Sequence, residues 1–345
     1  MHSVIVDSNL RHSTLLGMNT EMPHNENLPP VEPPSAGFLV QLFLVPAIIV
    51  SIIVCVWLAF HWLAHLGNDP QSYVRTLRRS NEGRWQAALN LANELRGPRG
   101  TSLKNDESLA LELGNILSEE VESGRSGEQS QTLRLYLCRA LGEFVIPSAA
   151  SPLVTQAQRI SDPETARAAV EALAVLDENL KKTDEEIDVH ADIVSTVIES
   201  SLSENDALRG ACAFTLGVVG GETAEERLIQ LNTDDNDDVR FNAALGLARL
   251  GRDESLDTLA DMLSLKNTSS SRQPDNPVAQ SEKYKRALVV INALRGLAML
   301  VDSVQSPLPR EIIEQIRVLQ TDDVNEVRAS AVALLKKIER IEKAA

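Results

Sequence analysis

The sequence is poor in aromatic residues and in cysteine, and both shortages limit the folds that it can adopt. Phe, Trp and Tyr make up 3% of the 345 residues, whereas the apolar residues together make up 43%. A β-sandwich needs aromatic and β-branched side chains at alternating positions, so this composition favours closely packed helices. The three cysteines lie among apolar residues, which implies no disulfide framework and fits a reducing compartment best.

Positive charge is also scarce. The chain has 33 Lys and Arg against 49 Asp and Glu, which gives a formal net charge of -16. A chain this acidic repels phosphate backbones, so we expect no nucleic acid among its partners.

The motifs of several common enzyme classes are missing as well. The sequence has no Gly-rich phosphate loop ending in Lys-Ser or Lys-Thr, no paired CxxC motif, no HExxH and no GxSxG. We therefore predict that the protein is not an enzyme, and we assign no catalytic or cofactor-binding residue.

One acidic run has part of the spacing of a calcium-binding loop. Asp234, Asn236 and Asp238 occupy its first three ligand positions, but Val239 and Leu245 stand where Gly and a bidentate Glu are required. Helix capping explains these polar residues better, so we predict no metal site here.

The longest apolar run lies near the N-terminus. Between Phe38 and Phe60 only Gln41, Pro46 and Ser51 fall outside the apolar set, and no charge interrupts the run. A helix of this length crosses a hydrocarbon core of about 30 Å, so residues 37–66 are predicted to be a transmembrane helix. A cleaved signal peptide is the alternative, but a long polar segment with acidic groups precedes the run where a short basic leader is expected.

The charges on either side of this run predict its orientation. Arg11 is the one basic residue before it, and six arginines follow it within the next 40 residues or so: Arg75, Arg78, Arg79, Arg84, Arg96 and Arg99. Positive charge stays on the cytoplasmic side, so we expect a translocated N-terminus and a cytoplasmic C-terminal domain. Arg75, Arg78 and Arg79 are then placed to contact anionic lipid at the membrane surface.

Residues 1–36 are polar and rich in proline. Such a segment buries too little apolar surface to offset the entropy lost on ordering, so we predict a disordered tail. Its proline cluster at 29–34 reads as a stiff spacer, with a polyproline ligand as the alternative.

From residue 67 onward the apolar residues recur at helical steps, and the sequence repeats itself. Residues 233–240 read TDDNDDVR and residues 321–328 read TDDVNEVR. In each copy, small apolar residues follow the arginine at the third and fourth positions, and the seventh position is Leu. With the arginine as marker, copies fall at positions 84, 134, 166, 209, 240, 290 and 328. The uneven intervals imply inserted loops, one of which is predicted at 266–281.

This frame resembles the HEAT repeat family, and more narrowly the short HEAT-like repeats also found in phycobilin lyases. The resemblance covers residues 68–345. It implies an all-α solenoid of about six to seven helix pairs, here preceded by one transmembrane helix. The marker arginines of such repeats are usually structural, so Arg209, Arg240 and Arg328 are expected to form a ladder with acidic residues of adjacent repeats.

In HEAT-like solenoids the second helix of each pair lines the concave side, where partners dock. Here these helices are expected at 185–199, 224–231, 254–263 and 309–319. They carry the acidic residues that we predict to bind the basic segment of a partner protein: Glu185, Glu186, Asp188, Glu225, Glu226, Asp257 and Asp261. The alternative is a solvated acidic face that binds nothing.

Two functions follow from these observations. The first is a single-pass membrane-anchored scaffold that binds a partner protein through its repeat surface. The second is an enzyme of the lyase-like HEAT branch, acting on a tetrapyrrole chromophore. That branch is soluble as a rule, and the sequence shows no polar cluster suited to a deep pocket, so we favour the scaffold.

Overall fold

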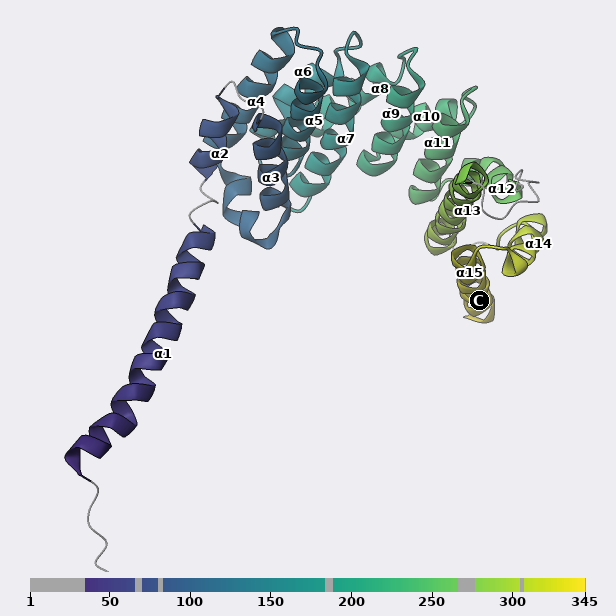
Figure 1. Cartoon of the computed structure of the whole chain (residues 1–345). Helices are drawn as coiled ribbons and strands as arrows, with labels where there is room; N and C mark the ends of the chain where they lie inside the picture. The colour runs from purple at the N-terminus through teal and green to yellow at the C-terminus, as the bar shows by residue number, and fades with distance from the viewer. Residues whose placement is uncertain are drawn as a thin grey trace, which may run out of the picture. The chain divides into compact units, whose positions relative to one another are not determined.

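The computed structural model describes residues 35–65, 70–79, 83–183, 189–265, 277–304 and 307–344. It divides into two compact units, residues 1–64 and residues 65–345 (Figure 1). All regular elements within the described ranges are helices. The predicted Pro-rich tail falls almost entirely outside them.

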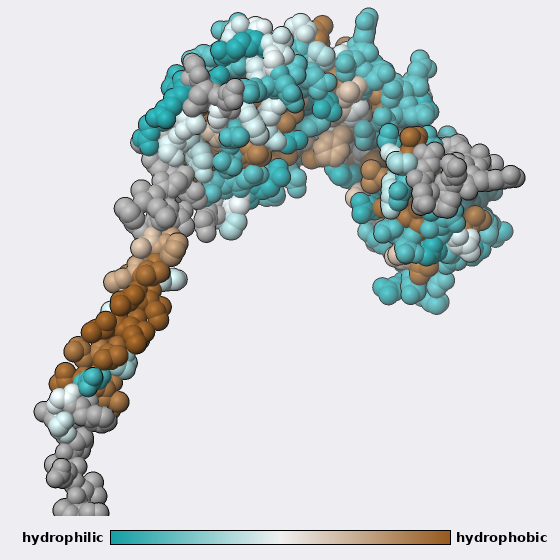
Figure 2. Space-filling model, in the orientation of Figure 1, coloured by the Kyte–Doolittle hydropathy of each residue, from teal (hydrophilic) through white to brown (hydrophobic). Residues whose placement is uncertain are grey.

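The first unit contains one long helix, α1 (Ala36–His65). Its stretch Val40–Phe60 is long and apolar enough to cross a membrane, and none of that stretch is buried. Hydrophobic residues cover most of this helix, and hydrophilic ones interrupt them near its N-terminal end (Figure 2). The core helix of a soluble protein would be buried, so an apolar helix with an exposed surface fits the predicted anchor.

The second unit is built from two layers of helices. One layer contains the helices that carry the repeat frame, one copy on each, and we call them the frame helices. They are α3 (Arg84–Arg96), α5 (Glu128–Gly142), α7 (Pro163–Leu180), α9 (Asp206–Val219), α11 (Asp237–Arg249), α13 (Pro277–Val304) and α15 (Asn325–Ala344). Each frame helix packs against the next one along the chain.

The other layer contains the outer helices. They are α2 (Pro70–Leu77), α4 (Glu107–Glu122), α6 (Ala150–Ala157), α8 (Val189–Ser200), α10 (Glu222–Leu231), α12 (Leu256–Ser264) and α14 (Arg310–Val318). Four short 3-10 helices lie in the connections, at Pro98–Asn105, Pro147–Ala149, Asp253–Ser255 and Leu319–Thr321. Each outer helix packs against the frame helix that follows it. The predicted all-α array of helix pairs is therefore confirmed, with the frame helix second in each pair.

Polar residues begin the frame helices as expected. Asp162, Asn205 and Asn236 each accept a hydrogen bond from the backbone N–H three residues further on, at 3.2, 2.9 and 3.3 Å. These caps satisfy N–H groups that have no partner within the helix. Asn236 belongs to the run with calcium-like spacing, and capping is the role that the structure gives it.

The sixth copy of the repeat lies where the sequence predicts it, with position 290 as its marker. Ala293, Leu294 and Leu297 are buried like the equivalent residues of the fifth copy, and Gly296 meets α11 and α12 as Gly246 meets α9 and α10. Arg286, one helical turn before the marker, donates to Asp322 as Arg209 donates to Asp234. The structure begins α13 at Pro277, and residues 266–276 lie outside the described ranges.

Candidate functional site

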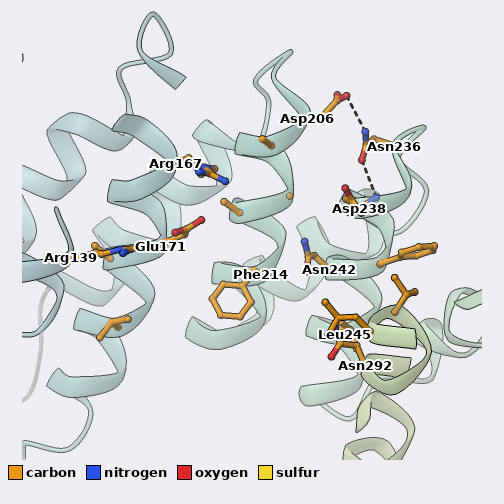
Figure 3. Close-up of a pocket in the computed structure, with 18 of the residues that line it drawn as sticks. Arg139, Arg167, Glu171, Asp206, Phe214, Asn236, Asp238, Asn242, Leu245 and Asn292 are labelled. Carbon is orange, nitrogen blue, oxygen red and sulfur yellow. Dashed lines mark hydrogen bonds between the residues drawn. The ribbon is translucent and has the colours of Figure 1, made fainter. Parts of the chain in front are cut away.

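A groove with a volume of about 750 Å³ runs across the frame helices (Figure 3). Its lining comes mainly from α5, α7, α9, α11 and α13. Four of its residues stand five positions after the marker of their own copy: Arg139, Glu171, Phe214 and Leu245. In stacked repeats, residues at equivalent positions lie on the same side of the array. The fifth position after the marker therefore contributes one groove residue from each of α5, α7, α9 and α11.

The middle of the groove is apolar. Val175, Phe214 and Leu288 line it with 38%, 44% and 58% of their surface exposed, and Leu245 lies beside them, partly buried. We call these four residues the apolar floor. Exposed apolar side chains that gather in one place, unlike single ones, are typical of interaction sites.

Polar side chains surround this floor, and two of them have no hydrogen-bond partner among the described residues. Asn236 is fully engaged, since it donates to Asp206 at 3.0 Å and accepts from the backbone N–H of Asp238 (Figure 3). Asn242 and Asn292 also line the groove, yet their side-chain amides form no hydrogen bond with the described residues. Each amide offers both a donor and an acceptor to a ligand.

The three C-terminal frame helices each carry a further basic residue: Arg249 on α11, Arg295 on α13 and Lys337 on α15. We call these three residues the basic row. The Arg249 guanidinium lies 6.0 Å from the centre of the Phe214 ring. Lys337 donates to Asp302 at 2.5 Å, while Arg249 and Arg295 are exposed and form no ion pair within the described part of the chain.

The marker arginines are structural, as expected, but in two different ways. Arg209 forms a bidentate pair with Asp234 at 2.9 and 3.0 Å. These hydrogen bonds from Arg209 lower the pKa of Asp234 below its ordinary value, against the smaller opposing effect of burial. Arg240 and Arg328 instead donate to carbonyl groups of the turn before their own helix, so they do not extend the ladder.

Equivalent arginine–carboxylate pairs join three other places in the array. Arg84 contacts Glu120 at 2.6 Å, Arg134 contacts Asp162 at 2.5 Å, and Arg286 contacts Asp322 at 2.6 Å. These pairs link one repeat to the next and do not enter the groove.

Four of the predicted partner-binding residues lie on outer helices. Glu225 and Glu226 belong to α10, and Asp257 and Asp261 belong to α12. The groove is lined by frame helices, so the expectation that the helices carrying these acids line the concave side is wrong. Glycines in the frame helices let neighbouring frame helices approach closely, as where Gly217 meets Gly246 and Gly142 meets Ala172. Glu185, Glu186 and Asp188 lie outside the described residues, and partner binding by these acids stays a prediction.

The predicted lipid-proximal arginines lie on and just after α2. Arg75 and Arg79 are exposed, and Arg78 donates from Nε to Glu112 at 2.5 Å. Lipid contact by these residues stays a prediction, and the Glu112 contact gives Arg78 a structural role besides.

The two cysteines of the frame helices are unsuited to nucleophilic chemistry. Burial raises the pKa of both the Cys138 and the Cys212 thiol to about 12. A thiol with this pKa is protonated at neutral pH, and the thiolate is the reactive form.

Comparisons with known proteins agree with the repeat architecture. Residues 195–273 match the family model described as HEAT repeats. The search of curated proteins finds no match. Among solved structures, the chain is similar to an engineered protein at 18% identity, with 79% of this chain and 98% of the other covered and a TM-score of 0.34.

Two further solved structures show similarity at the same level. Human deoxyhypusine hydroxylase in complex with glycerol is 19% identical, with coverage of 79% and 96% and a TM-score of 0.30. The YibA protein of Escherichia coli is 17% identical, with coverage of 78% and 93% and a TM-score of 0.40. Residues 195–273 therefore resemble HEAT repeats by the family model, and they lie in an array of similar helix pairs.

Proposed function

We propose that this protein is a membrane-anchored scaffold that binds a segment of a partner protein in the groove of its frame helices. The observation that carries the proposal is the apolar floor. Val175, Phe214, Leu245 and Leu288 come from four successive frame helices and line one groove. Covering such a surface removes apolar area from water, which is a main source of binding free energy between proteins.

The anchor gives this binding a location. Helix α1 would hold the groove near the bilayer, which raises its effective concentration toward partners on the same membrane. The arginines that follow α1 support a cytoplasmic position for the repeat array. Protease protection of sealed vesicles tests the orientation, since a repeat array cleaved from the non-cytoplasmic side would contradict it.

The alternative function, a lyase-like enzyme acting on a tetrapyrrole, has no specific observation in its favour. The scaffold proposal assigns no reaction to the groove.

Affinity capture of the full-length protein from mild-detergent membranes tests the scaffold function. The bound proteins are identified by mass spectrometry for the wild type and for the groove variant Phe214→Glu/Leu288→Glu. Both side chains are well exposed, so the variant is expected to fold, which circular dichroism checks. The matched control is Ile229→Glu, which changes an exposed apolar residue of the outer helix α10.

We expect the wild type and the control to retain the same partner and the groove variant to lose it. A partner that all three proteins retain would exclude the groove as its docking site. The charge-reversal variant Glu226→Lys/Asp257→Lys/Asp261→Lys is added to test the acidic outer helices. Loss of the partner in this variant alone would indicate that the acidic outer helices are the docking site, and it would support a basic partner segment.

A further inference from the structure

The basic row stands out against the overall charge of the protein. The chain has a formal net charge of -16, yet three successive frame helices, α11, α13 and α15, carry the basic residues Arg249, Arg295 and Lys337. Arg249 and Arg295 are exposed and lack a carboxylate partner in the described ranges. A ligand segment that passes Arg249 and Arg295 therefore meets two guanidinium groups that form no ion pair in these ranges, next to a groove lined by both acidic and basic residues.

Arg249 of the basic row adjoins the apolar floor. Arg249 stands over the ring of Phe214 at 6.0 Å, so its charge is held at the margin of the apolar surface. Leu288 is exposed on α13, the same helix that carries Arg295. A ligand that fills this half of the groove needs apolar side chains for the floor and negative charge for the row.

The free amides indicate the conformation of the ligand. Asn242 and Asn292 line the groove on adjacent frame helices, and their amides are unpartnered within the described chain. A helical ligand satisfies its own backbone groups, whereas an extended segment carries backbone N–H and C=O groups that need partners. Two amides that each offer a donor and an acceptor suit the extended form.

The spacing of the helices agrees with this choice. Packed helices lie roughly 8–10 Å apart. In a polyproline II conformation the chain rises about 3.1 Å per residue with three residues per turn, so every third side chain returns to the same side after about 9 Å. One turn of such a segment is therefore about as long as the distance between two neighbouring frame helices.

Building on the proposed docking function, we propose that the C-terminal half of the groove binds an extended, acidic segment of a partner protein. Apolar side chains of the segment, spaced three residues apart, contact Phe214, Leu245 and Leu288. Its Asp or Glu side chains pair with Arg249 and Arg295. Asn242 and Asn292 hydrogen-bond to its main chain.

Selection from a phage-displayed library of random 12-residue peptides tests this proposal. The full-length protein is immobilised in detergent micelles, and the Arg249→Glu/Arg295→Glu variant serves for counter-selection. The most enriched peptide is then synthesised, labelled and titrated by fluorescence anisotropy at low and high salt. A labelled 20-nucleotide single-stranded DNA is titrated alongside it.

We expect the enriched peptides to combine Asp or Glu with apolar residues three positions apart. Arg249→Glu and Arg295→Glu should each weaken binding by roughly tenfold or more, and salt should weaken wild-type binding. Asn242→Ala should weaken it by roughly two- to tenfold, as expected for one hydrogen bond. The control Arg310→Glu, an exposed arginine of the outer helix α14, should leave the affinity unchanged.

The other outcomes separate the two proposals. If the enriched peptides are basic, or if their affinity is unchanged by the Arg249 and Arg295 variants, the proposal of an acidic ligand is wrong. The proposed docking function would still hold. No enrichment above background overturns both. DNA binding that is stronger than peptide binding and is lost in the arginine variants overturns the proposal in favour of a nucleic acid ligand.

Discussion

Gly217 of α9 and Gly246 of α11 meet backbone to backbone. A Cβ atom placed on Gly217 would lie 2.4 Å from the Cα of Gly246, a separation that real Cβ atoms do not adopt. This contact brings two adjacent frame helices closer than side chains would allow, on the layer that contains the groove. The spacing of α9 and α11 therefore depends on both residues lacking a side chain.

Replacing Gly217 tests this contact. Gly217→Ala should destabilise the array by roughly 2–3 kcal/mol, because backbone cannot move aside as the end of a flexible side chain can. The matched control is Gly210→Ala on the same helix, where the new Cβ would lie an ordinary 3.6 Å from Asn242 Nδ2. The control should be neutral or slightly stabilising, because Ala favours helix over Gly. Urea unfolding followed by circular dichroism measures both, and equal effects would contradict the close contact.

The buried carboxylate of Glu120 predicts a dependence of stability on pH. Burial by itself raises the pKa of Glu120, but hydrogen bonds from Arg125, Ser130 and Arg84 outweigh it and lower the pKa from 4.5 to about 2. A depressed folded-state pKa contributes stability above the unfolded-state value, and this contribution is lost as the pH falls through about 4.5 toward 2.

The variant Glu120→Gln isolates this contribution from the other carboxylates. At pH 7 this variant should be less stable than the wild type by roughly 2–3 kcal/mol, because Arg84 and Arg125 then lose the carboxylate with which they pair. The difference should shrink as the pH falls from about 4.5 toward 2, because over this range Glu120 takes up a proton in the unfolded wild type but stays ionised in the folded one. Urea unfolding at a series of pH values measures it, and a constant difference would contradict the assigned pKa.

Two marker arginines with different partners should differ in their effect on stability. Arg209→Met removes a bidentate pair and leaves Asp234, whose side chain is 13% exposed, without its cation. Arg240→Met removes contacts to the turn before its own helix and to Asp237. We expect losses of roughly 2 kcal/mol for Arg209→Met and about 1 kcal/mol for Arg240→Met. Urea midpoints that order the two variants the other way would contradict the assignment of the ladder.

The anchor is tested within α1 itself. The substitution Val50→Arg/Ile53→Arg places two charges in the middle of the apolar stretch, and each charge costs about 2.5–3.5 kcal/mol at the centre of a membrane helix. We expect the variant to be released by alkaline carbonate extraction, whereas the wild type stays in the membrane pellet. The control Gln41→Arg lies close to the start of the stretch and should remain membrane-bound, because long side chains near helix ends reach the interface. Release of the wild type itself would contradict the anchor.

Local patterns in the sequence were enough to predict the helices and their repetition. The frame around Arg209, Arg240 and Arg328 recurs with small residues and Leu at fixed offsets, and each copy lies on one frame helix. Helix periodicity and capping act within a few residues, so they can be read from one segment at a time. The apolar run that predicts the anchor is local in the same sense.

The groove depends on contacts between segments far apart in the chain. The sequence does not show which helix layer forms the groove, because that depends on how the frame helices stack against one another. The fifth and ninth positions after each marker differ in residue type from copy to copy, so they do not stand out as a motif. Stacking brings Phe214, Leu245 and Arg249 together from two helices, and only the tertiary structure makes them one surface.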